Sequence, residues 1–169
     1  MLDRRRARWH GAGMAATDLD ATDRRILMLL QRDGSLALAE IAAAVGLTTS
    51  PCWKRIRRLE DAGVIRGRVA VVDPAKVGLP LTAFVEIEAG DHSPEWLARF
   101  AEAVAQMPEV LDVWRMAGDV DYLLRVAVPD MAAYDQFYRR LIAAAPLKNV
   151  SSRFAMEQVK GGTPLPIPP

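Results

Sequence analysis

The stretch from Leu47 to Gly63 constrains the fold more than any other part of the chain. Three hydroxyl-bearing residues and a proline stand near its start, and both kinds suit the first turn of a helix. Hydroxyl oxygens accept hydrogen bonds from N–H groups that the helix leaves free, and proline has no N–H group to satisfy. Cys52, Ile56 and Leu59 recur at helical spacing and form one apolar stripe. Gly63 is a favourable residue just after a helix end. The sequence therefore predicts one amphipathic helix here.

The rest of this helix is strongly basic. A short helix rich in small residues, 39–45, precedes it, and a turn containing Gly46 separates the two. Small residues let two helices approach closely, and this combination is typical of a helix-turn-helix, whose second helix enters the major groove of DNA. The alternative is an ordinary solvated charged face, which the preceding helix and turn disfavour.

The predicted DNA contacts are hydroxyl groups at the start of the basic helix and cations along and after it. They are Thr49, Ser50, Lys54, Arg55, Arg57, Arg58, Arg66 and Arg68. Residues 64–74 are rich in β-branched side chains, which predicts a short hairpin or strand, the wing of a winged helix. Residues 74–80 contain two prolines and a glycine and are expected to form a hinge.

Charge separates the chain into two halves. The net charge is +1 over 169 residues, but residues 1–80 carry +5 and residues 81–169 carry −4. The basic half is therefore expected to meet a polyanion. A single cysteine excludes an intramolecular disulfide and fits a reducing compartment, and no apolar run is long enough to span a bilayer. We therefore expect a cytoplasmic protein without a membrane partner.

The second half alternates strands and helices. Strands are expected at 82–88, 110–116, 122–128 and 150–159, with helices starting at Ser93 and Asp130. This β-α-β-β-α-β order predicts a ferredoxin-like domain, and the fold class is α+β. Trp96 and Trp114 are expected in the core or at a subunit contact.

Four segments follow from this pattern. They are a flexible basic tail at 1–18, a winged helix-turn-helix domain with its hinge at 19–80 (helix-turn-helix motif about 38–57), a ferredoxin-like domain at 81–160, and a coil tail at 161–169. Three interpretations of the first segment remain open: a basic arm that contacts phosphate, a tail without consequence, or an artefact of start-site choice, since Met14 lies just before the domain.

Several short motifs resemble one family. They are Leu19-Asp20, Asp23-Arg24, Val45-Gly46-Leu47, Pro51-Cys52 and Arg57-Arg58-Leu59-Glu60. With the strand order of the second half, they make nearly all of residues 19–167 similar to the Lrp/AsnC (feast/famine) transcriptional regulators. The family usually has Ser where this chain has Ala37, so a capping box with Glu40 is incomplete, at an expected cost of about 1 kcal/mol.

The resemblance implies an amino-acid effector bound between dimers, near the turn that joins the second and third strands of the ferredoxin-like domain. The corresponding residues are Arg115, Met116, Ala117, Gly118, Asp119 and Asp121, with Arg153, Phe154, Ala155 and Met156 of the last strand expected nearby. Backbone N–H groups of a turn suit a carboxylate, and Asp121 suits an α-ammonium group. The alternative is that these residues serve hairpin geometry alone.

Motifs at 51–55, 113–118 and 151–158 look closest to a cysteine-responsive, DecR-like subgroup. Val113 departs from it, since an aromatic residue is common at that position. Cysteine is therefore the first effector to test, followed by leucine, alanine and other neutral amino acids.

An enzyme site is not apparent. The two histidines, His10 and His92, have no nucleophile or metal-ligand partners at suitable spacing, and Asp119 and Asp121 are better explained by a tight turn. We expect no metal and no cofactor. For Cys52, core packing is favoured over a role as a redox sensor, although the nearby Lys54 and Arg55 would lower a thiol pKa.

The sequence thus predicts a non-enzymatic, sequence-specific transcriptional regulator that binds double-stranded DNA and a small amino acid. It is expected to assemble with itself as a dimer and as octamers. Two alternatives remain: an architectural DNA-binding protein without an effector, and a metabolic enzyme with a regulatory ferredoxin-like domain.

Overall fold

A computed structural model describes residues 18–168, so the basic tail predicted at 1–18 lies, apart from its last residue, outside the described residues. The described chain divides into two compact units. The helical unit contains residues 18–71 together with 160–168, and the sheet unit contains residues 72–159. Each is a separate body with its own core.

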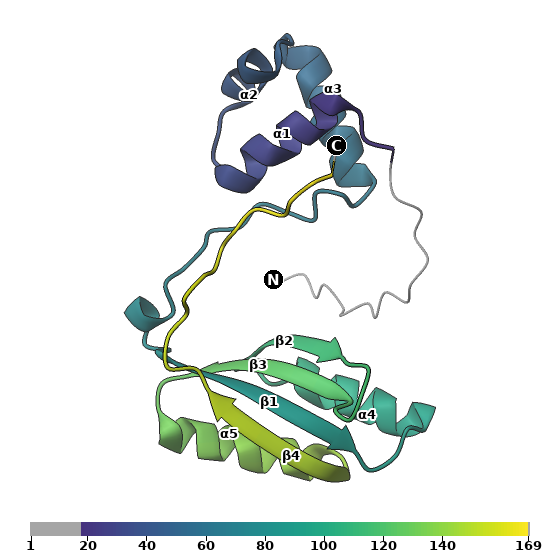
Figure 1. The fold of residues 1–169 in the computed structure, drawn as a ribbon, viewed down its shortest axis with the longest axis vertical. Helices are drawn as coiled ribbons and strands as arrows, with labels where there is room; N and C mark the ends of the chain where they lie inside the picture. Colours follow the sequence, from purple (N-terminus) through teal and green to yellow (C-terminus); the bar gives the residue numbers. More distant parts are fainter. Residues whose placement is uncertain (1–17, 169) are drawn as a thin grey trace. The chain divides into compact units, whose positions relative to one another are not determined.

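The helical unit is built from α1 (Ala21–Arg32), α2 (Leu38–Val45) and α3 (Thr49–Asp61), labelled in Figure 1. The start of α1 is closed by a reciprocal pair, in which the Asp23 N–H donates to Asp20 Oδ1 at 2.8 Å and the Asp20 N–H donates to Asp23 Oδ2 at 3.2 Å. These two bonds satisfy N–H groups that the helix itself leaves unpaired.

The start of α2 shows what the missing serine changes. Ala37 has no side-chain oxygen to cap the helix, but its N–H still donates to Glu40 Oε2 at 2.8 Å. Half of the expected capping box therefore survives. Gly46 ends α2 with φ +73°, a left-handed conformation that favours glycine, and so sets the turn into α3.

The three helices share one core, formed by Ile26, Leu27, Ile41, Ala42, Val45, Cys52, Ile56 and Leu59. The predicted stripe of α3 is confirmed, because Cys52 and Leu59 are fully buried and Ile56 is nearly so. Burial of each large aliphatic side chain is worth about 1.5–3 kcal/mol. This packing fixes the side of α3 that faces the solvent.

The expected wing strand is not formed. Residues 64–74 contain no strand, and Val69 and Val71 are 87% and 94% exposed. A β-branched run becomes a strand only beside a partner that takes its ladder hydrogen bonds, and none of the described residues pairs with it. The hinge that follows contains the short 3₁₀ helix η1 (Ala75–Val77).

The sheet unit has the predicted β-α-β-β-α-β order. Its elements are β1 (Leu81–Ala89), α4 (Pro94–Ala105), β2 (Val110–Arg115), β3 (Tyr122–Val128), α5 (Met131–Ala144) and β4 (Leu147–Phe154). The four strands lie in the order β2-β3-β1-β4, and all neighbours are antiparallel (Figure 1). In this order β1 lies in the centre of the sheet beside β4, which forms one edge.

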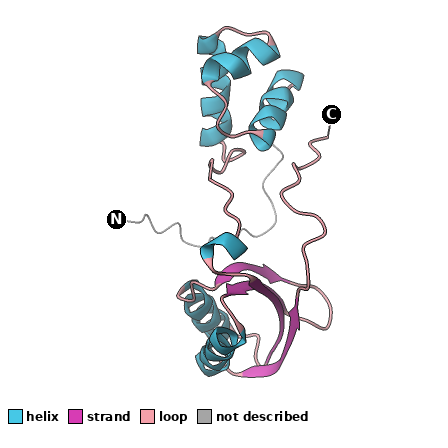
Figure 2. Ribbon diagram, turned by 90° about the vertical axis from the view of Figure 1, so that its left-hand side faces the viewer, coloured by secondary structure: helices cyan, strands magenta, loops and turns pink. Residues whose placement is uncertain are grey.

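Both helices of this unit cover one face of the sheet, as the edge view in Figure 2 shows. Ala83, Val85 and Ile87 of β1 point into this layer and are fully buried. Trp96 is also core, with its ring stacked on Phe100 at 5.0 Å between centroids. Trp96 is thus a buried core residue in the first turn of α4, which is one of the two positions expected for it.

The opposite face carries no helix among the described residues. Phe84, Trp114 and Leu123 lie on it, with Phe84 37% and Trp114 44% exposed. The charged side chains beside them are paired, since Arg125 contacts Asp112 at 2.5 Å. We call this surface, defined by Phe84, Trp114 and Leu123, the open face.

β4 differs from the prediction at both ends. It was expected at 150–159 but runs from Leu147 to Phe154. Pro146 ends the preceding segment, and the last bond to β1 goes from the Ala155 N–H to the Thr82 carbonyl at 2.9 Å. Because β1 begins at Leu81, a longer β4 would have no partner for its ladder bonds.

None of the described helices is both long enough and apolar enough to cross a bilayer.

Candidate nucleic-acid interface and effector site

The leading end of α3 presents the hydroxyl groups that were predicted to meet DNA. Thr49 and Ser50 are exposed, and the N-cap residue Thr48 forms no side-chain cap. The first N–H groups of a helix lack partners within it and carry a partial positive charge. This end of α3 can therefore donate hydrogen bonds to phosphate oxygens or base edges.

Two cations on α3 face the solvent. Lys54 is exposed and forms no ion pair with any described residue. Arg57 is also exposed and lies 3.6 Å from Glu60 and 3.5 Å from Asp61, long contacts that contribute little. Both side chains can turn to a phosphate without losing a strong partner.

Arg55 and Arg58 are placed differently. The Arg55 guanidinium donates to Asp20 at 2.5 Å and to Asp23 at 2.9 Å, and Arg58 donates to the other oxygen of Asp23. The Asp23 side chain is fully buried, so these two arginines neutralise it and join α3 to α1. We call Asp20, Asp23, Arg55 and Arg58 the α1–α3 clamp. Sequence reasoning missed it, and a DNA role for the two arginines stays a prediction.

The clamp also shifts two pKa values. The pKa of Asp20 falls to about 2, first because the Asp23 backbone N–H donates to its carboxylate and next because Arg55 pairs with it. The pKa of Arg55 is raised, since its hydrogen bonds to Asp20 and Asp23 favour the charged form. Asp20 is therefore ionised in the folded protein at any physiological pH.

This shift predicts an acid-dependent loss of stability. Because the folded pKa of Asp20 lies below its ordinary 3.8, the ionised carboxylate stabilises the fold fully above pH 3.8, and the effect is lost as the pH falls towards 2. Asp20→Asn keeps an N-cap oxygen but has no charge to lose. The melting temperatures of the two proteins, measured by circular dichroism, are expected to differ most near neutral pH and to converge towards pH 2. A constant difference over that range would contradict the assignment.

Two of the predicted cations, Arg66 and Arg68, lie in the segment after α3. Arg66 and Arg68 are exposed, and Arg68 lies 3.7 Å from Glu60. Since the strand expected here is absent, their position relative to DNA stays a prediction. Trp53 on α3 is 54% exposed and lines a surface pocket together with Ile41 and Ile56.

Cys52 is a core residue. Its side chain is fully buried against the α1–α3 core, and this burial raises the pKa of the thiol. The raising effect exceeds the lowering by Arg55. A protonated, enclosed thiol reacts poorly, so packing accounts for this residue.

The turn between β2 and β3 contains the first group of predicted effector residues. Arg115, Met116, Ala117, Gly118 and Asp119 are all exposed. Gly118 has φ +117°, where other residues are strained, and a Cβ built on it would meet nothing within 4 Å. The turn is therefore held open to the solvent by its backbone conformation.

Asp121 has a structural partner that the sequence did not reveal. Its Oδ2 accepts the Ala89 N–H at 2.8 Å, and its own N–H donates to the Ile87 carbonyl at 2.9 Å. His92 Nδ1 lies 3.9 Å from its other oxygen. Asp121 thus ties the turn to the end of β1, leaving one carboxylate oxygen for a ligand.

The second predicted group lies at the other end of the sheet. Phe154 pairs with Ala83 near the start of β1, whereas Tyr122, next to the turn, pairs with Ile87. The paired residues Ala83 and Ile87 are four residues apart, about 13 Å along β1, and β1 itself lies between β3 and β4. Within one chain, residues 153–156 therefore do not lie near Gly118, and the expectation that both groups take part in one effector site between copies stays a prediction.

Individual residues of the second group also have partners. Arg153 is ion-paired with Glu86, and Phe154 packs edge-on against Tyr134 at 4.8 Å between centroids. Met156 is fully exposed beyond the end of β4. Among the described residues no cluster of His, Cys, Asp and Glu could hold a metal ion.

A three-helix unit with an open basic helix and a separate ferredoxin-like unit define a DNA-binding regulator with its own ligand-binding domain. Residues 19–66 match the family description "Winged helix-turn-helix DNA-binding", and residues 82–165 match "Lrp/AsnC ligand binding domain". The chain belongs to the Lrp/AsnC family of transcriptional regulators.

Relatives agree over almost their whole length. The DNA-binding transcriptional activator DecR of Escherichia coli K12 is 57% identical over 150 residues, 88% of this chain and 99% of DecR. An AsnC family transcriptional regulator from Agrobacterium tumefaciens is 57% identical with a TM-score of 0.83, covering 88% and 97% of the two chains. A Neisseria meningitidis regulator solved with L-Met is 35% identical with a TM-score of 0.83 and the same coverage. These relatives are regulators and not enzymes, as expected for this chain.

Proposed function

We propose that this protein regulates transcription in the cytoplasm by binding duplex DNA as a homo-oligomer through α3, and that a small amino acid at the 115–121 turn changes this binding. The observation that carries the proposal is the open leading end of α3, with exposed Thr49 and Ser50 next to Lys54, which is exposed and has no ion pair among residues 18–168. On α3, Lys54 and Arg57 can turn to a phosphate without breaking a close ion pair, whereas Arg55 and Arg58 would have to leave Asp20 and Asp23.

Lys54→Ala tests this interface without disturbing the α1–α3 clamp. We expect weaker binding to duplexes selected with the wild-type protein, and a salt slope that is smaller by about 1, because one phosphate contact is lost. Fluorescence anisotropy over a range of salt concentrations measures both quantities. Lys76→Ala, an exposed lysine in η1, is the matched control and is expected to bind like the wild type. Equal binding by both variants would contradict the interface.

The chemistry of the 115–121 turn supports an amino-acid effector. A zwitterion needs donors for its carboxylate and an acceptor for its ammonium group. The turn offers exposed backbone and Arg115 as donors, with Asp119 and the remaining Asp121 oxygen as acceptors. The solved L-Met complex of the Neisseria relative adds methionine to cysteine, leucine and alanine as ligands to test.

The separation of the two predicted effector groups supports a site shared between copies. One chain cannot bring residues 115–121 and 153–156 together, because they lie at opposite ends of β1. A site that uses both needs a second copy of the chain, as expected for an effector bound between dimers. Ligand binding at such a site would shift the equilibrium between assembly states.

Thermal shift against the twenty amino acids tests the effector. A ligand that binds only the folded state raises the melting temperature of the wild type. We expect Gly118→Val to lose this rise, since valine is strained at φ +117° and its side chain enters the open turn. Gly78→Val, at φ +81° with equally open surroundings, is the matched control for backbone strain and is expected to keep the rise.

A wild type that responds to no amino acid would instead favour the architectural alternative. An unaltered response of Gly118→Val would place the site elsewhere.

A further inference from the structure

The C-terminal segment 160–168 packs on the helical unit, although it follows β4 of the sheet unit. It contains no helix or strand, as expected for a coil tail, but its contacts were not predicted. The chain therefore passes between the two units twice, once near residue 72 and once near residue 160.

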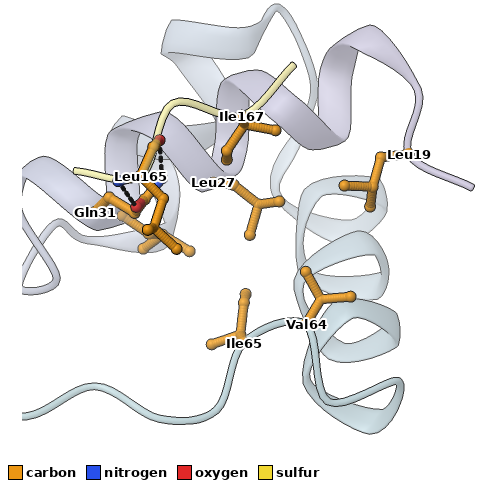
Figure 3. A pocket seen from close by; sticks show the side chains of 8 residues that line it. Leu19, Leu27, Gln31, Val64, Ile65, Leu165 and Ile167 are labelled. Atoms are coloured by element: carbon orange, nitrogen blue, oxygen red, sulfur yellow. Dashed lines mark hydrogen bonds between the residues drawn. The ribbon is translucent and has the colours of Figure 1, made fainter. Parts of the chain in front are cut away.

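Gln31 of α1 holds the tail by its backbone. The Gln31 side-chain amide donates to the Leu165 carbonyl at 3.4 Å, and the Leu165 N–H donates to Gln31 Oε1 at 2.6 Å (Figure 3). Gln31 thus binds both the N–H and the carbonyl of one residue, which is how a neighbouring strand binds an extended backbone. It does not depend on the Leu165 side chain, which is 75% exposed.

An apolar groove of about 260 Å³ lies beside this contact. In Figure 3, Leu19 lines it from just before α1, Leu27 from α1, and Val64 and Ile65 from the segment after α3. Leu165 and Ile167 of the tail complete its lining, and Ile167 packs against the helical core and is half-buried, whereas the other described residues of the tail are exposed. Ile167 therefore holds the tail by apolar packing of its side chain, whereas Leu165 holds it by the two backbone hydrogen bonds to Gln31.

The tail sequence suits an extended ligand. Prolines 164, 166 and 168 alternate with Leu165 and Ile167. Each proline fixes φ and removes an N–H donor, so docking costs less conformational entropy and leaves fewer donors to satisfy. Of the N–H groups between these prolines, that of Leu165 is the one that Gln31 accepts.

We propose that the groove beside Gln31 is a binding site for the Pro-x-Pro-x-Pro tail of the same chain, and that the docked tail is a second tether between the sheet unit and the DNA-binding unit. The tether continues directly from residues 153–156, the predicted effector segment. It gives the sheet unit a route to the DNA-binding unit besides the hinge. This second role rests on the proposed function, but the docking itself does not.

A variant that ends at Lys160 exposes the empty groove. We expect it to bind a synthetic peptide of residues 161–169 saturably, measured by nuclear magnetic resonance titration of the Gln31 side-chain amide. The full-length chain is expected to bind the peptide much more weakly, because its own tail competes at high local concentration. Failure of the folded truncated protein to bind the peptide would overturn the proposal.

Two pairs of variants, one in the peptide and one in the truncated protein, test which side chains hold the tail in the groove. A peptide with Ile167→Ala is expected to bind about tenfold more weakly, whereas Leu165→Ala, which removes an exposed side chain, is expected to bind nearly as well. In the truncated protein, Gln31→Ala is expected to reduce binding, and Gln136→Ala on α5 is the control. Equal effects of both peptide changes would overturn the assignment of Ile167 as the anchor.

If the truncated chain does not fold, amide hydrogen exchange of the full-length protein tests the docking of the tail instead. The Leu165 N–H is expected to exchange more slowly than in the free peptide, and Gln31→Ala is expected to remove this protection. Exchange of Leu165 at the free-peptide rate in the wild type would overturn the docking.

The role as a tether has its own measurement. The truncated protein is expected to keep its basal DNA binding and to lose most of the change that an amino acid produces. An undiminished response would overturn the tether while leaving the groove intact. A wild type that binds no DNA would overturn the proposed function but not the docking.

Discussion

Replacing Asp23 by alanine is expected to lower the free energy of unfolding of the helical unit by roughly 2–3 kcal/mol. The Asp23 side chain is fully buried and accepts from both Arg55 and Arg58. Without it, two positive charges stay close together at the α1–α3 contact and lose the carboxylate that they share. The hydrogen bond from the Asp20 N–H to Asp23 Oδ2 at the start of α1 is lost as well. The two arginines are partly exposed, which limits the effect.

Urea unfolding followed by circular dichroism and by resonances of the helical unit measures this change. Asp61→Ala on α3 is the control, since its carboxylate is exposed and lies 3.5 Å from Arg57, and it is expected to change stability by less than about 0.5 kcal/mol. Equal stability of the Asp23 variant and the wild type would show that the clamp is not a structural element.

The clamp changes how the predicted DNA contacts should be tested. From the sequence, the double change Arg55→Ala with Arg58→Ala is expected to weaken duplex binding, to flatten the salt slope and to leave the oligomer intact. In the structure it leaves Asp23 buried without a positive partner. A loss of binding by this variant reports on DNA contact only if the helical unit is shown to remain folded.

Replacing Trp114 by glutamate is expected to convert a dimer into a monomer, with the dissociation constant raised at least about a hundredfold. The helices α4 and α5 cover one face of the sheet, and Phe84, Trp114 and Leu123 are left on the open face. A partner copy that buries this face would have to accommodate an unpaired carboxylate in an apolar contact. DNA binding is expected to weaken as well, because a dimer presents two recognition helices to two half-sites.

Analytical ultracentrifugation at micromolar concentration measures the assembly. Met131→Glu is the matched control, since Met131 is 55% exposed at the start of α5, on the helical layer, where a carboxylate also suits the helix dipole. It is expected to leave the dimer unchanged. A dimer in both variants would show that the open face is not the contact between copies, and a monomeric wild type would contradict self-assembly itself.

Patterns along the chain are enough to predict the helices and strands and their order. Periodicity shows which residues share a face, so the stripe of Cys52, Ile56 and Leu59 and the buried alternation of Ala83, Val85 and Ile87 were predictable and are buried. The helix-turn-helix, the β-α-β-β-α-β order and the family followed from these patterns and motifs. Local signals such as Asp20 and Gly46 marked helix ends, since caps act within a few residues.

Which residues become partners, in contrast, depends on how distant segments pack in the folded protein. Arg55 bonds Asp20 from 35 positions away and Gln31 bonds Leu165 from 134 positions away, distances at which no periodicity operates. The pairing of Asp121 with Ala89, the separation of the two predicted effector groups and the missing wing strand likewise depend on which segments lie side by side. A pattern along the chain reports the face a side chain occupies, whereas its charge partner and its strand neighbour are set by packing between segments far apart in sequence.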